Sequence, residues 1–200
     1  LAQYHNMQIN LKIALNSAYG ALGNQWFRFY DVRNAEAVSV AGQLSIRWAE
    51  RAVNDYLNKI LETDNEDYVL ASDTDSLYVT MEKMVEKVGL TDTDKIIKFL
   101  DTVCDGKIQD VIDKCYGEMA EYVNAFQQKM VMKREVLADV GIWVAKKHYV
   151  LNVHNSEGVQ YEEPKLKIMG IEAVKSSTPE PCRNALKKAF KIMMNGTEDD

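Results

Sequence analysis

The sequence contains few of the residues that build disulfide-bonded or zinc-binding proteins. Its 200 residues include three cysteines and three histidines, which form neither a Cys-x-x-Cys pair nor a His-Glu-x-x-His motif. This pattern argues against a disulfide scaffold and a structural zinc site, and it is typical of a reduced, cytoplasmic protein. If the protein uses a metal, we expect oxygen ligands, which favour Mg²⁺ or Mn²⁺.

Long apolar runs are also missing. No run approaches the roughly 20 residues that a membrane helix needs, so we expect no membrane partner. The first residue is Leu1, and no signal-peptide pattern follows it, so we expect the chain to be a fragment of a longer reading frame. The composition, with 46% hydrophobic and 27% charged residues, is that of a folded globular protein of one or two domains.

Positive charge is scarce overall but concentrated in one part of the chain. Residues 129–191 hold twelve basic and seven acidic residues, a net charge of +5. Because the whole chain carries −6, the remainder carries −11. Such asymmetry is compatible with a phosphate-facing surface beside an acidic, metal-binding one, although solvated faces on an ordinary protein explain it as well.

Helical periodicity dominates the first third of the chain. We predict a helix over residues 8–19 that Gly20 ends, and a second over residues 34–61 with Asn34 as N-cap. In the second helix, apolar and small residues recur at spacings of three and four, which predicts a buried stripe. The stripe consists of Val38, Ala41, Ser45, Ala49, Val53 and Leu57.

The remaining pattern predicts an α+β fold around an antiparallel sheet. Two short apolar runs flank a polar turn and read as a hairpin, helices follow, strands come next, and a helix with Thr178 as N-cap closes the chain. The expected strands are residues 67–72, 77–80, 130–137, 142–153, 158–161 and 165–169, and the expected helices between them are 94–104 and 107–126.

The polar turn of the predicted hairpin contains Asp73-Thr74-Asp75. Two carboxylates at a hairpin tip could bind a divalent metal. The same tripeptide recurs at residues 92–94, where we interpret it as helix capping, because acids complement the positive end of a helix. The first copy differs because it lies between two apolar strands, which makes a metal site a serious alternative to a solvated turn.

Two further clusters have ordinary alternatives when each is taken alone. Lys12, Asn16 and Tyr19 share one face of the first predicted helix, which suits a triphosphate and a base pair or simply a solvated face. Lys147 and Tyr149 are expected on one face of a strand, with Lys146 on the other. That strand either contacts nucleic acid or is an edge strand whose lysines prevent pairing with another chain.

In this order and spacing, the three clusters resemble family B DNA polymerases. Lys-x-x-x-Asn-Ser-x-Tyr-Gly resembles the motif of the fingers helix, Asp-Thr-Asp-Ser the catalytic hairpin of the palm, and Lys-Lys-x-Tyr the motif at the primer end. Residues 24–31 and 165–179 look like those of the replicative polymerases of large tailed phages. The resemblance implies a C-terminal fingers helix over 1–25, a palm with an RRM-like antiparallel sheet over 26–170, and the start of the thumb over 171–200.

The resemblance implies template-directed DNA polymerisation in replication by two-metal nucleotidyl transfer from a dNTP to a primer 3′-hydroxyl. Two Mg²⁺ ions, or Mn²⁺, would be the cofactors. Asp75 would bind metal directly and Asp73 would support it. Lys12 would meet the triphosphate and act on the leaving group, Asn16 would place the triphosphate, and Tyr19 would pack beneath the nascent base pair.

The resemblance also implies DNA contacts and partners. Lys147 and Tyr149 would hold the primer terminus, with Lys146, Lys165, Lys167 and Lys175 as further phosphate contacts. Primer-template DNA, dNTPs, the remaining polymerase domains and a sliding clamp bound through regions outside this chain are the expected partners, in the host cytoplasm if the source is a phage.

The sequence departs from the family pattern at two metal-binding positions. The upstream Asp-x-x-Ser-Leu-Tyr motif, which carries the first catalytic aspartate, is absent, and so are the exonuclease and most of the thumb. In the phage relatives an aspartate usually stands where this chain has Lys133, which leaves Glu135 as a candidate accessory carboxylate. We therefore expect the isolated 200 residues to be inactive.

Two other functions are weaker alternatives. A nucleotidyl cyclase also carries paired aspartates on a palm-like sheet, but it has no need of the motif at Lys12 to Gly20. A non-catalytic RRM-like module would need exposed aromatic residues on its central strands. Asp73 and Asp75 also argue against such a module, because unpaired acids repel phosphate unless metal is present.

Overall fold

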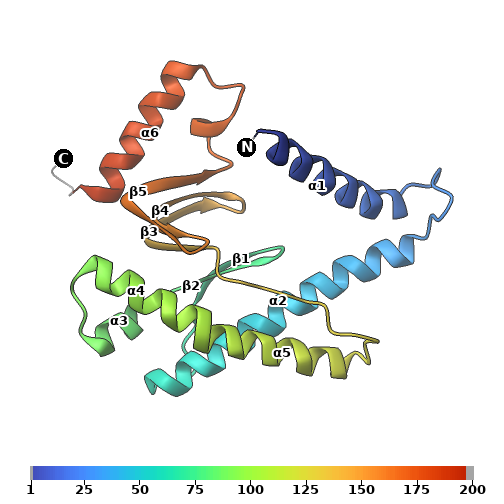
Figure 1. Cartoon of the computed structure of the whole chain (residues 1–200), viewed down its shortest axis with the longest axis horizontal. Coiled ribbons are helices and arrows are strands. Elements are labelled where there is room, and N and C mark those ends of the chain that lie inside the picture. Colours follow the sequence, from blue (N-terminus) through green and yellow to red (C-terminus); the bar gives the residue numbers. More distant parts are fainter. Residues whose placement is uncertain (1, 197–200) are drawn as a thin grey trace.

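The computed structural model describes residues 2–196, and its elements are arranged in layers (Figure 1). Helix α6 lies on one side of a three-stranded sheet, a two-stranded hairpin lies on the other, and helices α2, α4 and α5 lie beyond the hairpin. The elements are α1 (Ala2–Leu22), α2 (Val32–Leu61), β1 (Val69–Asp73), β2 (Ser76–Val79), α3 (Glu82–Val88), α4 (Thr93–Val103), the π-helix η1 (Cys104–Ile108), α5 (Gln109–Tyr122), β3 (Val136–Ala145), β4 (His148–Ser156), β5 (Val159–Met169), the 3₁₀-helix η2 (Glu172–Val174) and α6 (Glu180–Asn195).

Helix α1 extends away from the layers and meets α2 near its beginning, so that the two helices form an open V (Figure 1). Residues 3–20 are all exposed. The predicted stop at Gly20 is wrong, because the helix continues to Leu22 and ends in the turn in which Gly23 N donates to the Gly20 carbonyl. One glycine costs a helix only about 1 kcal/mol and does not by itself end it.

Helix α2 begins at Val32, earlier than predicted, because Asp31 rather than Asn34 is the N-cap and accepts a hydrogen bond from Arg33 N. The predicted stripe is confirmed over its second half, where Ser45, Ile46, Ala49, Val53 and Leu57 are buried. Val38 and Ala41 are exposed, because the first turns of α2 reach beyond the core toward α1. The amphipathic pattern of α2 therefore extends beyond the residues that pack against the core.

The predicted hairpin is confirmed as the antiparallel pair β1–β2. On the helix side, Leu77 and Val79 of β2 pack against a core that α2 and α5 supply around the buried Tyr68. On the opposite side, Tyr78 packs against the three-stranded sheet. Strand β2 is therefore covered on both faces, which explains its continuous apolar run, whereas Leu70 of β1 is exposed.

The helices between the two sheets follow the prediction in part. Asp92 caps α4 by accepting a hydrogen bond from Lys95 N, so the second Asp-Thr-Asp copy is a helix cap as predicted. The π-helix η1 joins α4 to α5 without a break in the helical backbone. Helix α3 was not predicted, because its seven residues are too few for a periodic pattern and its N-cap Met81 makes no side-chain hydrogen bond.

The three-stranded antiparallel sheet has the order β3–β4–β5. Three predicted strand boundaries are wrong. Residues 130–135 precede β3, the two segments predicted at 158–161 and 165–169 are one strand, β5, and the strand predicted over 142–153 is interrupted by a turn at Lys146-Lys147. A positive φ of 62° at Lys147 makes this turn, which the alternation of residue types does not reveal. The turn between β4 and β5 lies at Glu157-Gly158.

Helix α6 covers the face of the sheet on which Val150 lies, with Met194 buried beside it. It begins at Glu180 with Pro179 as N-cap, so the predicted capping by Thr178 is wrong. Within residues 2–196, no strand pair joins β1–β2 to β3–β5. The α+β class with antiparallel sheets is confirmed, and within these residues none of the helices has the length and apolar character needed to span a bilayer.

Replacing Leu57 by alanine should lower the free energy of unfolding by about 2–5 kcal/mol, because Leu57 is fully buried in the helical core. Val38→Ala on the same helix is the matched control. Its side chain is 53% exposed, so we expect a change within about 0.5 kcal/mol. Urea unfolding of both variants measures the two free energies of unfolding. Equal losses in Leu57→Ala and Val38→Ala would contradict the prediction, because they would show that the first turns of α2 are packed against other residues.

Candidate active site

The turn between β1 and β2 carries the two candidate carboxylates. Asp73 ends β1 and pairs with Ser76, the first residue of β2. Thr74 adopts a positive φ of 52°, which closes the turn, and its hydroxyl donates to Asp73 Oδ1 over 3.1 Å. Asp75 is exposed, whereas the Asp73 side chain is mostly covered at 24% exposure. The turn therefore presents one carboxylate to solvent and holds the other against the protein.

Lys147 meets Asp73 across the gap between the two sheets. Its Nζ lies 3.5 Å from Asp73 Oδ1, although 74 positions separate the two residues. The contact forms because the β3–β4 turn that contains Lys147 lies beside the β1–β2 turn. Two of the clusters singled out in the sequence are therefore brought together, one at each turn.

Beneath these two turns lies a cluster of three aromatic rings, formed by Tyr78, Trp143 and Tyr149. The Tyr78 ring meets Trp143 and Tyr149 edge-to-face, with centroid distances of 5.5 and 5.4 Å. Tyr149 is only 7% exposed. Burial raises its pKa, hydrogen bonding with Tyr78 raises it further, and the negative charges of Glu135 and Asp73 add to the effect. Tyr149 therefore holds its phenolic proton more firmly than an exposed tyrosine does.

Glu135 lies just before β3 and forms an ion pair with Lys167 of β5, with 2.6 Å between Oε1 and Nζ. The preceding residue, Arg134, is almost fully buried. Its guanidinium binds Asp101 of α4, donates to Asn155 Oδ1 over 2.8 Å, and places Nε 3.7 Å from Asp105 Oδ1. Arg134 thus fixes the segment that carries Glu135 to the helical layer.

The other predicted lysines are spread over the sheet and beyond it. Lys165 Nζ lies 4.0 Å from the centre of the Tyr161 ring, and Lys146 is exposed in the β3–β4 turn. Lys175 Nζ hydrogen-bonds Glu172 over 2.6 Å, which holds the pKa of that carboxyl below its ordinary value. Neither of these two contacts involves Asp73 or Asp75.

Lys12, Asn16 and Tyr19 lie on α1 and are exposed. The Tyr19 hydroxyl and Ser39 Oγ of α2 are 2.7 Å apart, so this face of α1 turns toward α2 at the end where the two helices meet. The structure therefore presents the three side chains on a projecting helix, apart from the layers that hold the carboxylates.

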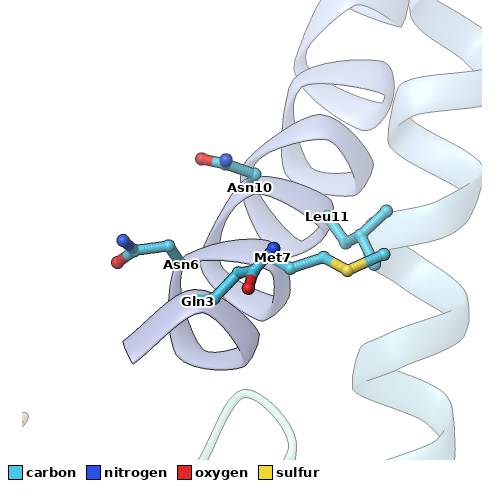
Figure 2. Close-up of a pocket in the computed structure, with 5 residues that line it drawn as sticks. All are labelled: Gln3, Asn6, Met7, Asn10 and Leu11. Atoms are coloured by element: carbon cyan, nitrogen blue, oxygen red, sulfur yellow. The ribbon is translucent and has the colours of Figure 1, made fainter. Parts of the chain in front are cut away.

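An open hollow of about 710 Å³ follows the first half of α1 (Figure 2). It is lined by Gln3, Asn6, Met7, Asn10 and Leu11, and Met7 and Leu11 point toward α2. None of the predicted site residues lines it. A second hollow of about 530 Å³ lies at the end of α2 around Asn58, also away from Asp73.

The carboxylates supply suitable oxygen donors for a divalent cation but not a complete set. Carboxylate oxygens are the ligands that Mg²⁺ and Mn²⁺ prefer. In the part of the chain that the structure describes, however, no three histidine, cysteine, aspartate or glutamate side chains come close enough together to hold an ion. Asp73 and Asp75 alone would leave most coordination positions to water or to groups from elsewhere.

Three residues around the carboxylates were not singled out in the sequence as site residues: Tyr78, Trp143 and Arg134. Tyr78 and Trp143 carry ordinary strand signals, and nothing in their spacing reveals that they meet. Arg134 does have a signal, because it directly precedes the candidate accessory carboxylate Glu135.

Comparisons with known proteins match nearly the whole chain. A sequence profile described as DNA polymerase family B matches residues 1–199. The DNA-directed DNA polymerase of Escherichia phage RB69 is 46% identical over 96% of this chain, and that of Enterobacteria phage T4 is 42% identical over 96%. The chain covers 22% and 23% of those two proteins, which is less than a quarter of their length.

Replacing Arg134 by glutamine should lower the free energy of unfolding by about 1.5–3 kcal/mol, because hydrogen bonds to a buried charged group are lost. Arg51→Gln is the control, since the Arg51 guanidinium and Asp55 form an exposed pair 3.8 Å apart that should contribute within about 1 kcal/mol. Denaturant unfolding compares the two variants. A loss for Arg134→Gln no larger than for Arg51→Gln would contradict the structural role assigned to Arg134.

Proposed function

Because this chain belongs to DNA polymerase family B, we propose that it forms part of a template-directed DNA polymerase acting in DNA replication. In this reaction the primer 3′-hydroxyl attacks the α-phosphorus of a dNTP, and pyrophosphate leaves. The observation that carries the proposal is the 3.5 Å contact between Lys147 Nζ and Asp73 Oδ1, which joins a candidate DNA-binding turn to a candidate catalytic turn.

Three parts of the polymerase correspond to three parts of the fold. Residues 1–25 form the C-terminal fingers helix, which agrees with the exposed, projecting α1. Residues 26–170 form the palm, and its two cores enclose the β1–β2 hairpin. Residues 171–200 begin the thumb, which agrees with the position of α6 on the outer face of the sheet.

The carboxylates of the β1–β2 turn hold two divalent cations together with ligands from outside this chain. Asp75 is the direct ligand, because it is exposed at the tip of the turn, and Asp73 supports it. Glu135 is the accessory carboxylate. Mg²⁺, or Mn²⁺ in its place, would supply positive charge at the attacking 3′-oxygen and along the triphosphate. The missing ligand is the aspartate of the Asp-x-x-Ser-Leu-Tyr motif, which this chain does not contain.

The dNTP binds along the exposed face of α1. The Lys12 ammonium neutralises charge on the triphosphate and on the leaving pyrophosphate, since a lysine acts as a point charge for phosphate. Asn16, one helical turn further on, donates its amide to the same group, and Tyr19 packs beneath the nascent base pair. The shared face at spacings of four and three residues supports this arrangement.

Primer-template DNA lies across the β3–β4 turn. Lys147 and Lys146 are both exposed there, and each can meet a backbone phosphate. Lys165, Lys167 and Lys175 extend the basic surface along β5 and beyond it. Tyr149 reaches DNA only by its exposed edge, so its main effect is to fix the turn from below.

The remaining polymerase domains complete this part of the enzyme, and a sliding clamp binds through regions outside the chain. If the source is a phage, the enzyme acts in the host cytoplasm. The two alternative functions have less support, because the family match favours a polymerase over a nucleotidyl cyclase. The RRM-like alternative needs exposed aromatic rings on the central strand, and Tyr149 of β4 is buried.

In the complete polymerase, Asp75→Asn should lower kcat for primer extension by about 100-fold or more, because charge stabilisation at the reacting phosphate is lost. DNA binding should survive. Asp92→Asn in the second Asp-Thr-Asp copy is the matched control, since asparagine also caps a helix and activity should not change. Single-turnover primer extension measures both. Near-normal turnover of Asp75→Asn would remove Asp75 from the metal site.

Lys147→Ala should weaken primer-template binding and reduce the slope of log K against log salt by about 0.9, the value for one lost phosphate contact. Lys114→Ala provides the comparison, because Lys114 pairs with Glu118 on the distant helix α5. Fluorescence anisotropy with labelled primer-template at several salt concentrations gives both slopes. An unchanged slope for Lys147→Ala would place the DNA elsewhere.

A further inference from the structure

We propose that Trp143 is a positioning residue of the polymerase site, holding the carboxylate turn at Asp73–Asp75 at a fixed separation from the lysine turn at Lys146–Lys147. The expected effect on catalysis rests on the proposed function. The structural claim, that Trp143 sets the distance between the two turns, does not depend on that function. The juxtaposition that carries it is the three-ring cluster of Tyr78, Trp143 and Tyr149 between the two sheets.

Side chains alone set the separation of the two sheets at this point. No backbone hydrogen-bond ladder joins β1–β2 to β3–β5 in residues 2–196. Of the residues in β2, Leu77 and Val79 face the helical core, and Tyr78 faces the sheet. The hairpin is therefore located relative to the sheet chiefly by the rings that meet Tyr78.

Trp143 occupies the cluster from the β3 side and Tyr149 from the β4 side. Their Cα atoms are paired across the two strands, and their ring centroids are 6.4 Å apart. Tyr78 meets the Trp143 ring with an interplanar angle of 72° and a centroid distance of 5.5 Å. This is the edge-to-face arrangement that aromatic pairs prefer, so small rotations or shifts of the hairpin are opposed.

Gly141 makes room for the tryptophan. A Cβ atom at this position would lie 2.6 and 2.7 Å from two atoms of the Trp143 ring and 2.8 Å from Leu151 Cδ2. Atoms do not approach this closely, so any larger residue at position 141 would displace the ring. The absence of a side chain at Gly141 therefore leaves the space that the Trp143 ring occupies.

The indole N–H of Trp143 takes no part in this role. Trp143 Nε1 is buried and has no hydrogen-bond partner among the described residues. The ring therefore acts here through its shape and not through its donor. Phenylalanine supplies an aromatic ring without a buried donor, which makes Trp143→Phe the conservative variant.

The first experiment measures the separation of the two turns directly. Spin labels on Thr74→Cys and Lys146→Cys in the complete polymerase, with the exposed Cys182 replaced by serine, report the distance between the turns by double electron–electron resonance. Trp143→Ala should broaden or displace the distance distribution, and Trp143→Phe should restore it. A distance distribution in Trp143→Ala that matches that of the protein with Trp143 intact would overturn the proposal.

Trp48→Ala is the matched control. Trp48 also packs an aromatic ring, against Tyr122 with a centroid distance of 5.3 Å, but it lies in the helical layer away from both turns. We expect it to lower the unfolding temperature without changing the distance distribution. If Trp48→Ala broadens the distribution as much as Trp143→Ala does, the effect is one of general stability and the proposal fails.

The second experiment measures catalysis. Trp143→Ala should lower kcat by about 10- to 100-fold, as expected for a displacement of reacting groups by about 1 Å, with the KM for dNTP and the Kd for primer-template unchanged. Trp143→Phe should recover most of the kcat, and Trp48→Ala should keep it. An unchanged kcat in Trp143→Ala would overturn the proposal. Failure of the unsubstituted enzyme to extend primers would defeat the proposed function, and the distance measurement would then decide the positioning role.

Gly141 gives an independent test of the same contact. Gly141→Ala should displace the distance distribution as Trp143→Ala does, because the new methyl group pushes the ring. Adding Gly141→Ala to Trp143→Ala should cause little further change, since the remaining close atom is the flexible end of Leu151. Additive effects of the two substitutions would show that Gly141 acts through something other than the Trp143 ring.

Discussion

The packing of strand β2 on both of its faces is the constraint on which the rest of the structure depends. The turn of the β1–β2 hairpin must stay in solvent to present carboxylates, while the strands of the hairpin must be fixed firmly enough to aim them. The helical core below takes Leu77 and Val79, and the sheet above takes Tyr78. Because side chains alternate between the faces of a strand, four residues of β2 are enough to attach the hairpin to both layers.

The charge asymmetry of the sequence has a structural counterpart in these layers. The basic segment, residues 129–191, forms the three-stranded sheet and most of α6, whereas the acidic remainder includes the helical layer and the β1–β2 turn. The two meet at Asp73 and Lys147. An ion pair with an exposed partner contributes only about 0–1 kcal/mol, so this contact places opposite charges side by side without holding either group firmly.

The sequence predicted those features that depend on local pattern. The hairpin, the capping role of Asp92 and the second half of the α2 stripe all follow from the character of nearby residues. The turn at Lys147 was missed because a lysine with positive φ breaks the strand without a glycine or proline to mark it. Helix α3 was missed because its stability comes from the packing of Met84 and not from periodicity.

The candidate site was predictable as a list of residues but not as a geometry. Family resemblance picked out Asp73 and Lys147 separately, and only the fold brings them within 3.5 Å. The residues that enforce this proximity, Tyr78 and Trp143, resemble any aromatic residue in a strand. Contacts between sheets join positions far apart in the chain, and neither helical nor strand periodicity carries information about them.

Helix α1 differs from the packed layers in the exposure of its large apolar side chains. Around α2, α5 and the two sheets apolar side chains form three packed clusters, but on α1 a series of large apolar residues is exposed. They include Tyr4, Met7, Ile9, Leu11, Ile13 and Leu15. Tyr4, Met7, Leu11 and Leu15 follow one another at spacings of three and four residues and therefore share one face of the helix. An exposed apolar face is typical of an interaction site. In the proposed polymerase the remaining domains would cover this face, since the chain spans less than a quarter of the length of the two phage polymerases. With the apolar face covered in this way, Lys12 and Asn16 would remain as the part of α1 that is free to meet a nucleotide.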